Sequence, residues 1–189
     1  QMCIRDRYYA ELGHAIPSGV KEELEIKVKT CVYRAICALG VNHGSVNMDL
    51  LITNGGNVHI IDIGARMGGN LIGSHIVPIG TGIDYMGNMI RAAVSDPTCW
   101  KPECQPRSVA TKLLALTPGK VKELPDFDQI SSKYDVQIEH HLHVGDAITP
   151  YRTNLDGCGY VVSCGYDVDN CIALATDVRK VIDESIIRE

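Results

Sequence analysis

Two aspartates near a glycine-rich loop carry the clearest chemical signal in this sequence. Asp49 lies in the apolar stretch 45–53, Asp62 lies in the stretch 58–63, and the pair Gly55-Gly56 lies between the two stretches. Apolar stretches on either side of a Gly-Gly turn predict a β-hairpin. With the two glycines as a two-residue turn, Asp49 is expected to lie directly opposite Asp62.

Facing carboxylates are a source of repulsion in a hairpin. Their Cβ atoms would lie roughly 5 Å apart, where like charges are destabilising unless a cation lies between them. At a Mg²⁺ site the protein commonly supplies two carboxylate ligands, and water and nucleotide phosphates supply the others. Asn47 and Gly64 are expected on the same face. The opposite, core-facing side is predicted to hold five apolar residues: Met48, Leu50, Ile52, Ile61 and Ile63. The alternative is a pair of solvated charges on an exposed face.

The loop after the second strand supplies groups that bind anions. Arg66 follows two residues after Gly64 and can place a cation beside the carboxylates. The pair Gly68-Gly69 allows backbone N–H groups to approach an anion closely. The carboxylates, the arginine and the glycine loop together indicate a metal–phosphate site.

The segments 47–51 and 61–70 resemble the last part of the ATP-grasp domain. In that family an acidic residue on one strand precedes an acidic-x-Asn-x-Arg string on the next. Most similar are the ATP-dependent carboxylate–amine ligases of the L-amino-acid ligase type, and biotin carboxylase is more distant. The resemblance implies an α+β fold: the second half of an ATP-grasp domain, an antiparallel sheet with helices, over residues 8–97, and a small α+β C-terminal domain over residues 108–189.

The resemblance also implies roles for individual residues. Asp49 and Asp62 would hold Mg²⁺, or Mn²⁺, bridging the phosphates of ATP. Arg66 would contact the γ-phosphate and an acyl phosphate, and the Gly69 amide would help to hold the developing oxyanion. His14 resembles a histidine that lines the substrate site of these ligases.

The sequence departs from the family pattern at three positions. Asp49 and Asp62 stand where the family more often has Glu, so each carboxylate reaches one methylene less. Gly64 stands where the family has Asn, which removes one ligand. Asn70 and Asn47 are the residues that could compensate, and we expect both to contribute to the nucleotide site.

Periodicity predicts the elements that position these residues. The segment 22–39 is predicted to be an amphipathic helix, capped by 17–19 and ended by Gly40. Its apolar positions recur at helical spacing: Leu24, Val28, Cys31, Val32, Ala35, Ile36 and Leu39. A second helix is expected over 83–94. The proline-containing segment 95–107 is interpreted as the boundary between two structural units.

The second half of the chain is predicted to be a smaller α+β unit. Strands are expected over 109–116, 136–144 and 160–164. A closing helix is expected over 168–187, with apolar residues at helical spacing. This mixture of strands and helices favours an α+β fold class.

Composition excludes several classes of protein. The chain has 189 residues, of which 45% are hydrophobic and 22% charged, so it is expected to fold rather than to be disordered. Its net charge of −5 argues against nucleic acid or an anionic membrane as a partner. No apolar run approaches the length of a membrane span, which favours a cytoplasmic location. The eight cysteines form no C-x-x-C pair and are expected to be reduced and mostly buried.

Other polar residues have structural alternatives. His141 and His143 would share a strand face, but a solvated strand is favoured over a metal site. His43 and His75 could contact substrate or serve structure alone. The thiols of Cys158 and Cys164 are interpreted as packing residues, since no base lies near them in sequence. Asp84 and Asn88, one helical turn apart, would face the site or lie on the exposed side of their helix.

The leading hypothesis is an ATP- and Mg²⁺-dependent carboxylate–amine or carboxylate–thiol ligase acting through an acyl phosphate. Its partners would be small molecules, a carboxylate and an amine or thiol nucleophile, and a homodimer is compatible with this expectation. The alternatives are a biotin-carboxylase-like enzyme that activates bicarbonate and a silent binding or oligomerisation module. Residues 1–7 are interpreted as a non-native leader, and the chain as a truncated gene product that is inactive alone.

Overall fold

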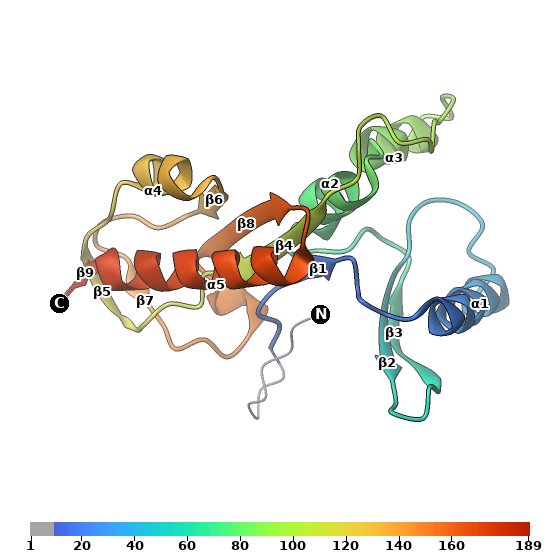
Figure 1. Cartoon of the computed structure of the whole chain (residues 1–189), viewed down its shortest axis with the longest axis horizontal. Helices are drawn as coiled ribbons and strands as arrows, with labels where there is room; N and C mark the ends of the chain where they lie inside the picture. Colours follow the sequence, from blue (N-terminus) through green and yellow to red (C-terminus); the bar gives the residue numbers. More distant parts are fainter. Residues whose placement is uncertain (1–9) are drawn as a thin grey trace. The chain divides into compact units, whose positions relative to one another are not determined.

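A computed structural model describes residues 10–189 of the chain (Figure 1). These residues form two compact units. We call residues 18–105 the hairpin unit, and residues 10–17 together with 106–189 the sheet unit. The leader expected over residues 1–7 lies outside the described residues. From residue 10 onwards, the structure has no helix that is both long and apolar enough to cross a membrane.

The hairpin unit begins with the predicted amphipathic helix. Its elements are α1 (Glu22–Ala38), β2 (Asn47–Ile52), β3 (Val58–Gly64), the π-helix η1 (Ile72–Ile76), α2 (Val77–Thr81) and α3 (Tyr85–Ala93). The predicted apolar stripe of α1 is half-buried, except that Leu39 is exposed, and no residue of α1 is fully buried. Lys21, rather than the segment 17–19, is the N-cap residue, and it has an extended backbone.

The strands β2 and β3 form the predicted antiparallel hairpin, but its turn differs from the prediction. The Thr53 amide donates to the Asn57 carbonyl over 3.0 Å, and the Gly56 amide donates to the Thr53 carbonyl over 2.9 Å. The loop therefore has three residues rather than two. Gly56, with φ +74°, takes the left-handed conformation that closes a three-residue hairpin loop. This loop shifts the register next to it by one residue, so Leu50 pairs with Ile60.

A β-bulge then reverses this shift. Between Leu50 and Asp49 the register changes by one residue, and Ile61 is the extra residue. Asp49 consequently lies opposite Asp62, as predicted, although the turn prediction was wrong. The assignment of Ile61 to the core face was also wrong: 66% of this residue is exposed, and Ile60 occupies that face instead.

Helix α3 is fixed by polar contacts at both ends. The Asp84 carboxylate accepts a hydrogen bond from the Gly87 amide over 2.9 Å and forms an ion pair with Arg91. Asn88 is 0% exposed, which contradicts both predicted placements of this residue. Its side chain donates to the Cys99 carbonyl over 2.6 Å and accepts from the Cys99 amide over 2.8 Å. This pair of bonds holds the following loop against the helix.

The sheet unit contains two antiparallel sheets, two α-helices and one 3₁₀ helix, which confirms the α+β fold class. Its helices are α4 (Phe127–Tyr134), the 3₁₀ helix η2 (Asn154–Asp156) and α5 (Val168–Ser185). One sheet has the strand order β1 (Ala15–Ile16), β4 (Ser108–Leu113), β8 (Gly159–Gly165) and β6 (Gln137–His140). The other has the order β7 (Ala147–Ile148), β5 (Gly119–Glu123) and β9 (Ile187–Arg188).

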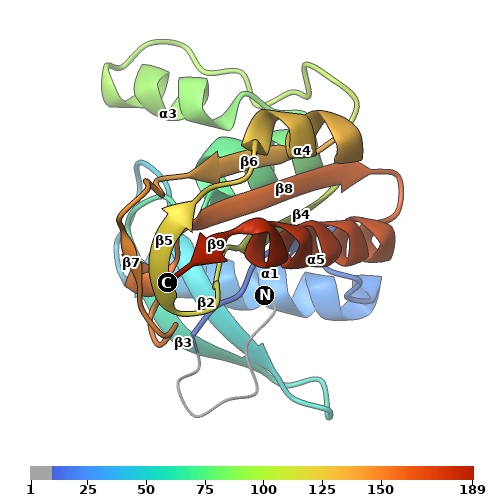
Figure 2. The same cartoon turned by 90° about the vertical axis from the view of Figure 1, so that its left-hand side faces the viewer.

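The predicted closing helix packs along the larger sheet of this unit. Helix α5 lies over β4 and β8 (Figure 2). Its apolar stripe supplies Ala175, Val178 and Ile182, all 0% exposed, to a core shared with Leu114 and Val161. This core explains why the 3.6-residue period of the segment was a reliable signal, since one stripe of the helix must be apolar to cover a sheet.

Two further predictions were wrong. Strand β6 ends at His140, so His141 and His143 lie beyond it. The His141 amide donates to the Cys158 carbonyl over 3.2 Å, and the His143 amide donates to the Asp146 carboxylate over 2.7 Å. The cysteines of the described residues are free but not mostly buried. Cys158 and Cys171 are buried, and burial raises the pKa of both thiols.

The stacked contact of His140 with Phe127 predicts a pH-dependent stability. The ring centroids lie 3.8 Å apart, and partial burial, with the nearby His143 and His141, lowers the pKa of His140 below 6.5. The folded state then favours the neutral ring, so this stabilisation is complete above pH 6.5 and decreases as pH falls below it. We expect urea unfolding followed by circular dichroism to show a lower midpoint at about pH 5.5 than at about pH 7.5.

The variant His140→Gln is expected to lose much of that pH dependence. His59→Gln, which removes an exposed histidine from the hairpin unit, serves as the control and should leave the dependence unchanged. An unchanged pH profile in His140→Gln would contradict the prediction.

Candidate functional site

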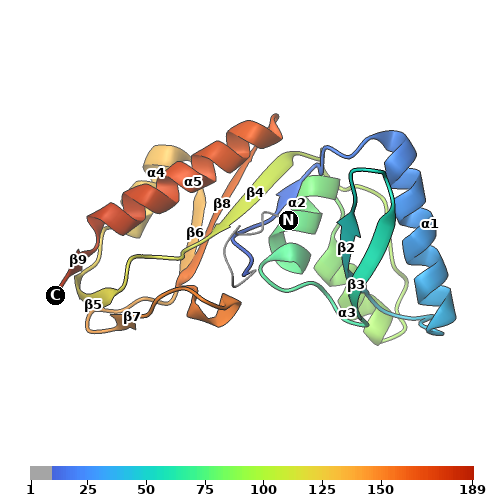
Figure 3. The same ribbon diagram turned by 90° about the horizontal axis from the view of Figure 1, so that it is seen from below.

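The polar face of the β2–β3 hairpin brings the predicted metal ligands together. Strands β2 and β3 lie side by side (Figure 3). In their register Asp49 pairs with Asp62, and Asn47 pairs with Gly64. Directly paired residues in an antiparallel sheet point to the same face, so both carboxylates and the Asn47 amide lie on one side of the hairpin. Asp49 is half-buried and Asp62 is exposed.

The missing side chain at position 64 leaves room for Arg66. A Cβ atom added to Gly64 would lie 3.5 Å from both Cγ and Nε of Arg66, so the arginine folds back over the end of β3. Its guanidinium donates to the Met67 carbonyl over 2.9 Å and is otherwise exposed. Arg66 therefore occupies the space beside the strand that an asparagine at position 64 would share.

The two loop glycines have different surroundings. A Cβ atom on Gly68 would lie 2.8 Å from Oδ1 of Asn47, so the close approach of the Asn47 side chain requires glycine there. Gly69 is exposed, with no heavy atom within 4 Å of such a Cβ atom. Asn70 and Leu71 follow with φ of 52° and 65° and lead into the π-helix η1. Gly69 thus presents open backbone, whereas Gly68 is packed against the hairpin.

The chemistry of this donor set fits a hard divalent cation. Within residues 10–189 neither Asp49 nor Asp62 takes part in an ion pair with a basic side chain, so two like charges face each other without compensation. The same part of the chain contains no group of three or more His, Cys, Asp or Glu residues arranged to hold a metal ion. Two carboxylates without a third protein ligand suit Mg²⁺, which keeps waters and takes phosphate oxygens.

His14, the predicted substrate-site histidine, belongs to the sheet unit. Only 7% of it is exposed, and its backbone amide donates to the Thr111 hydroxyl over 3.1 Å. Its Nε2 atom lies 3.5 Å from a carboxylate oxygen of Glu11. The structure therefore gives His14 a defined setting beside Thr111 of β4.

The remaining candidate residues have local roles in the hairpin unit. His75 contacts the Ser74 hydroxyl over 2.8 Å within η1. The Nε2 atom of His43 lies 3.1 Å from the Ala92 carbonyl. The His43 side chain lines a cavity, together with Thr98 and Trp100. Sequence analysis did not predict this cavity, because its walls come from two segments about fifty residues apart with no shared motif.

Comparison with solved structures establishes the class to which this fold belongs. The chain aligns with phosphoribosylglycinamide synthetase from Anaerococcus prevotii (TM-score 0.78, 24% identity, 100% of this chain and 47% of that one). It also aligns with L-amino acid ligase from Bacillus licheniformis (TM-score 0.83, 21% identity, 98% and 48%). Biotin carboxylase from Campylobacter jejuni aligns with a TM-score of 0.68 at 16% identity, over 99% and 41%. The chain thus has the fold of the C-terminal part of ATP-grasp ligases and spans about half the length of these structures.

A family model also matches part of the second half of the chain. Residues 112–184 match the L-amino acid ligase C-terminal domain 2. This match confirms the resemblance to ATP-grasp ligases of the L-amino-acid ligase type. A comparison with curated protein sequences produced no significant match.

Proposed function

We propose that this chain is part of an ATP-dependent carboxylate–amine or carboxylate–thiol ligase that acts through an acyl phosphate. The observation that carries the proposal is the direct pairing of Asp49 with Asp62 beside the glycine loop. Small-molecule substrates, a cytoplasmic location and a homodimer form part of the same proposal.

Each residue of the hairpin has a role that its position supports. Asp49 and Asp62 would hold Mg²⁺, which neutralises phosphate charge when bound. Arg66 has an exposed guanidinium on a short tether and can turn from the Met67 carbonyl to a γ-phosphate. The open backbone at Gly69 can donate its N–H to an oxyanion as the carboxylate attacks phosphorus.

The neighbouring polar residues would complete this site. The Asn47 amide lies on the carboxylate face and Asn70 follows the glycine loop, so both can contribute to binding of the nucleotide. His14 would line the substrate pocket. Phosphoryl transfer requires positioning and charge stabilisation above all, which is what this set of residues can provide.

As the group that ATP activates, an organic carboxylate is favoured over bicarbonate. The L-amino acid ligase structure aligns with a TM-score of 0.83, against 0.68 for biotin carboxylase, and the family model covers residues 112–184. The alternative outside the enzymes is a binding module without catalytic activity. It is favoured by Gly64, which stands where the family has asparagine.

Calorimetry on the gene product that carries this chain tests the proposal. We expect ATP binding that requires Mg²⁺ and is lost when EDTA is added. For the 189-residue chain by itself we expect no ADP formation from ATP, since it spans 48% of the L-amino acid ligase structure. Nucleotide binding that does not depend on metal, or no binding at all, would refute the ligase proposal.

A further inference from the structure

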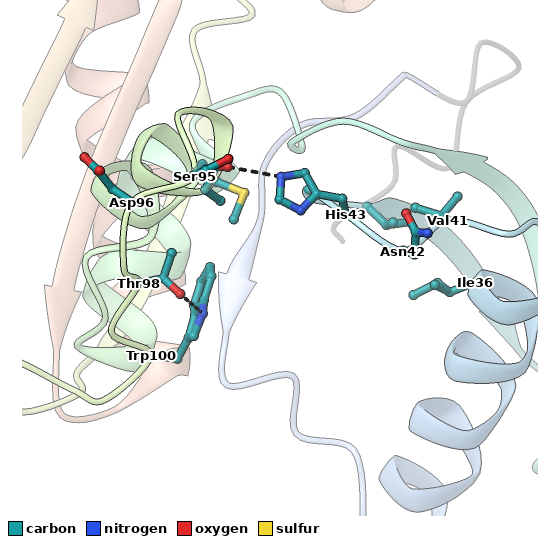
Figure 4. Close-up of a pocket in the computed structure, with 12 residues that line it drawn as sticks. Ile36, Val41, Asn42, His43, Ser95, Asp96, Thr98 and Trp100 are labelled. Atoms are coloured by element: carbon teal, nitrogen blue, oxygen red, sulfur yellow. Dashed lines mark hydrogen bonds between the residues drawn. The ribbon is translucent and has the colours of Figure 1, made fainter.

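One cavity of the hairpin unit is lined by residues other than the paired aspartates. It has a volume of about 700 Å³, within the usual range for small-molecule sites. Thr98 and Trp100 lie on one side of it, and Ile36, Val41 and Asn42 lie on the other (Figure 4). Both walls belong to the same compact unit.

Helix α3 holds both walls in place. On one side, the two hydrogen bonds between Asn88 and Cys99 fix the loop that carries Trp100, whose ring also packs edge-on against Tyr85 with centroids 6.3 Å apart. On the other side, His43 is tied to the Ala92 carbonyl at the end of the helix. Because each wall is bonded to one helix, the cavity is largely pre-formed.

The polar groups of the cavity have assignable hydrogen-bonding roles. A carbonyl oxygen only accepts, so His43 Nε2 must carry the proton that it shares with Ala92, and Nδ1 of the neutral ring is left as an acceptor. The Trp100 indole N–H donates to the Thr98 hydroxyl over 3.0 Å, which leaves the hydroxyl proton of Thr98 as a donor. His43 and Thr98 therefore offer one acceptor and one donor beside an indole ring.

The charge of the lining disfavours anionic ligands. Among the described residues that line the cavity, none is Lys or Arg, and Asp96 is the one carboxylate. Figure 4 shows Asp96 directed away from His43 and Trp100. Transfer of an unpaired anion into such a site is costly, whereas an uncharged aromatic ring can stack on the indole.

We propose that this cavity binds an uncharged planar aromatic molecule whose edge carries a donor and an acceptor, as in an aromatic amide. The ring packs beside Trp100, the ligand N–H donates to Nδ1 of His43, and the ligand carbonyl accepts from Thr98. The proposal concerns a site distinct from the phosphate chemistry of the hairpin and is independent of the proposed ligase function.

Trp100 is the single tryptophan of the chain and reports directly on its own cavity. We would titrate the ¹⁵N-labelled 189-residue chain with benzamide, benzoate and cyclohexanecarboxamide, which have similar size. Benzamide is expected to shift the Trp100 indole resonance saturably. Benzoate is expected to bind about tenfold more weakly because it is charged, and cyclohexanecarboxamide several-fold more weakly because it cannot stack.

Substitutions test the hydrogen bonds. His43→Ala should weaken benzamide binding by about 3- to 10-fold, and the control His59→Ala, an exposed histidine of the same unit, should not. If His43→Ala fails to fold, as judged by the backbone amide resonances, Thr98→Val must show the same loss. No saturable shift with benzamide, equal binding of benzoate, or full affinity in the folded variants would each overturn the proposal.

Discussion

Replacing Asp62 by Asn is expected to change metal affinity and stability in opposite directions. Asp62 directly faces Asp49, so its loss should weaken Mn²⁺ binding by about tenfold or more, as expected when a carboxylate ligand is removed. Without metal, the same variant should be more stable than the original chain by roughly 0.2–1 kcal/mol, because two like charges no longer face each other. Electron paramagnetic resonance of free Mn²⁺ measures the affinity, and urea unfolding followed by Trp100 fluorescence measures the stability.

A matched control separates this effect from a change in net charge. Glu103→Gln removes an exposed acid from the same unit and should alter neither quantity. A variant that had merely damaged the hairpin would lose stability together with affinity. Unchanged Mn²⁺ affinity in Asp62→Asn, or unchanged ligase activity of the gene product at limiting Mg²⁺, would show that Asp62 is not a ligand.

Gly159→Ala is expected to have the largest effect on the sheet unit. Gly159 pairs with His140 across β8 and β6 and has φ +145°. A Cβ atom there would lie 2.0 Å from the Glu139 carbonyl oxygen and 2.7 Å from the His140 Cα. Both neighbours are backbone atoms of the paired strand, so the clash can be relieved only by moving β6 away. We expect a loss of about 3 kcal/mol or more in the free energy of unfolding.

Gly145 offers the matched control for this substitution. It also has a positive φ, +97°, but an added Cβ atom would meet no heavy atom within 4 Å. Gly145→Ala should therefore cost only the conformational strain, about 1–2 kcal/mol. Hydrogen exchange measured by mass spectrometry should show increased exchange in peptides from β6 and β8 for Gly159→Ala alone. Equal costs for the two variants would mean that the strand contact at Gly159 contributes nothing.

The pairing of the two aspartates was predictable from the local sequence pattern, but the path of the chain between them was not. The sequence predicted that Asp49 would lie opposite Asp62, although it placed a two-residue turn where the structure has three residues. The bulge at Ile61 compensates because Val58 and Ile60 need the apolar face and Asp62 needs the polar one. Strict alternation from Val58 would have put Asp62 on the apolar side, so one extra residue reconciles the two demands.

The sequence by itself determined the elements with a strong period and the family to which they are similar. The stripe of α1, the two strands of the hairpin and the closing helix α5 were predictable because neighbours along the chain set their periodicity. The glycine loop and Arg66 were predictable because their spacing is local.

Only the tertiary structure decided which distant residues meet. It buried Asn88 against Cys99, joined His43 to the end of α3 and placed Trp100 in the cavity that we propose as a binding site. It also folded Arg66 back over Gly64 and packed Gly68 against Asn47. These contacts depend on how side chains fit in three dimensions, and such fit leaves no period or spacing along the chain.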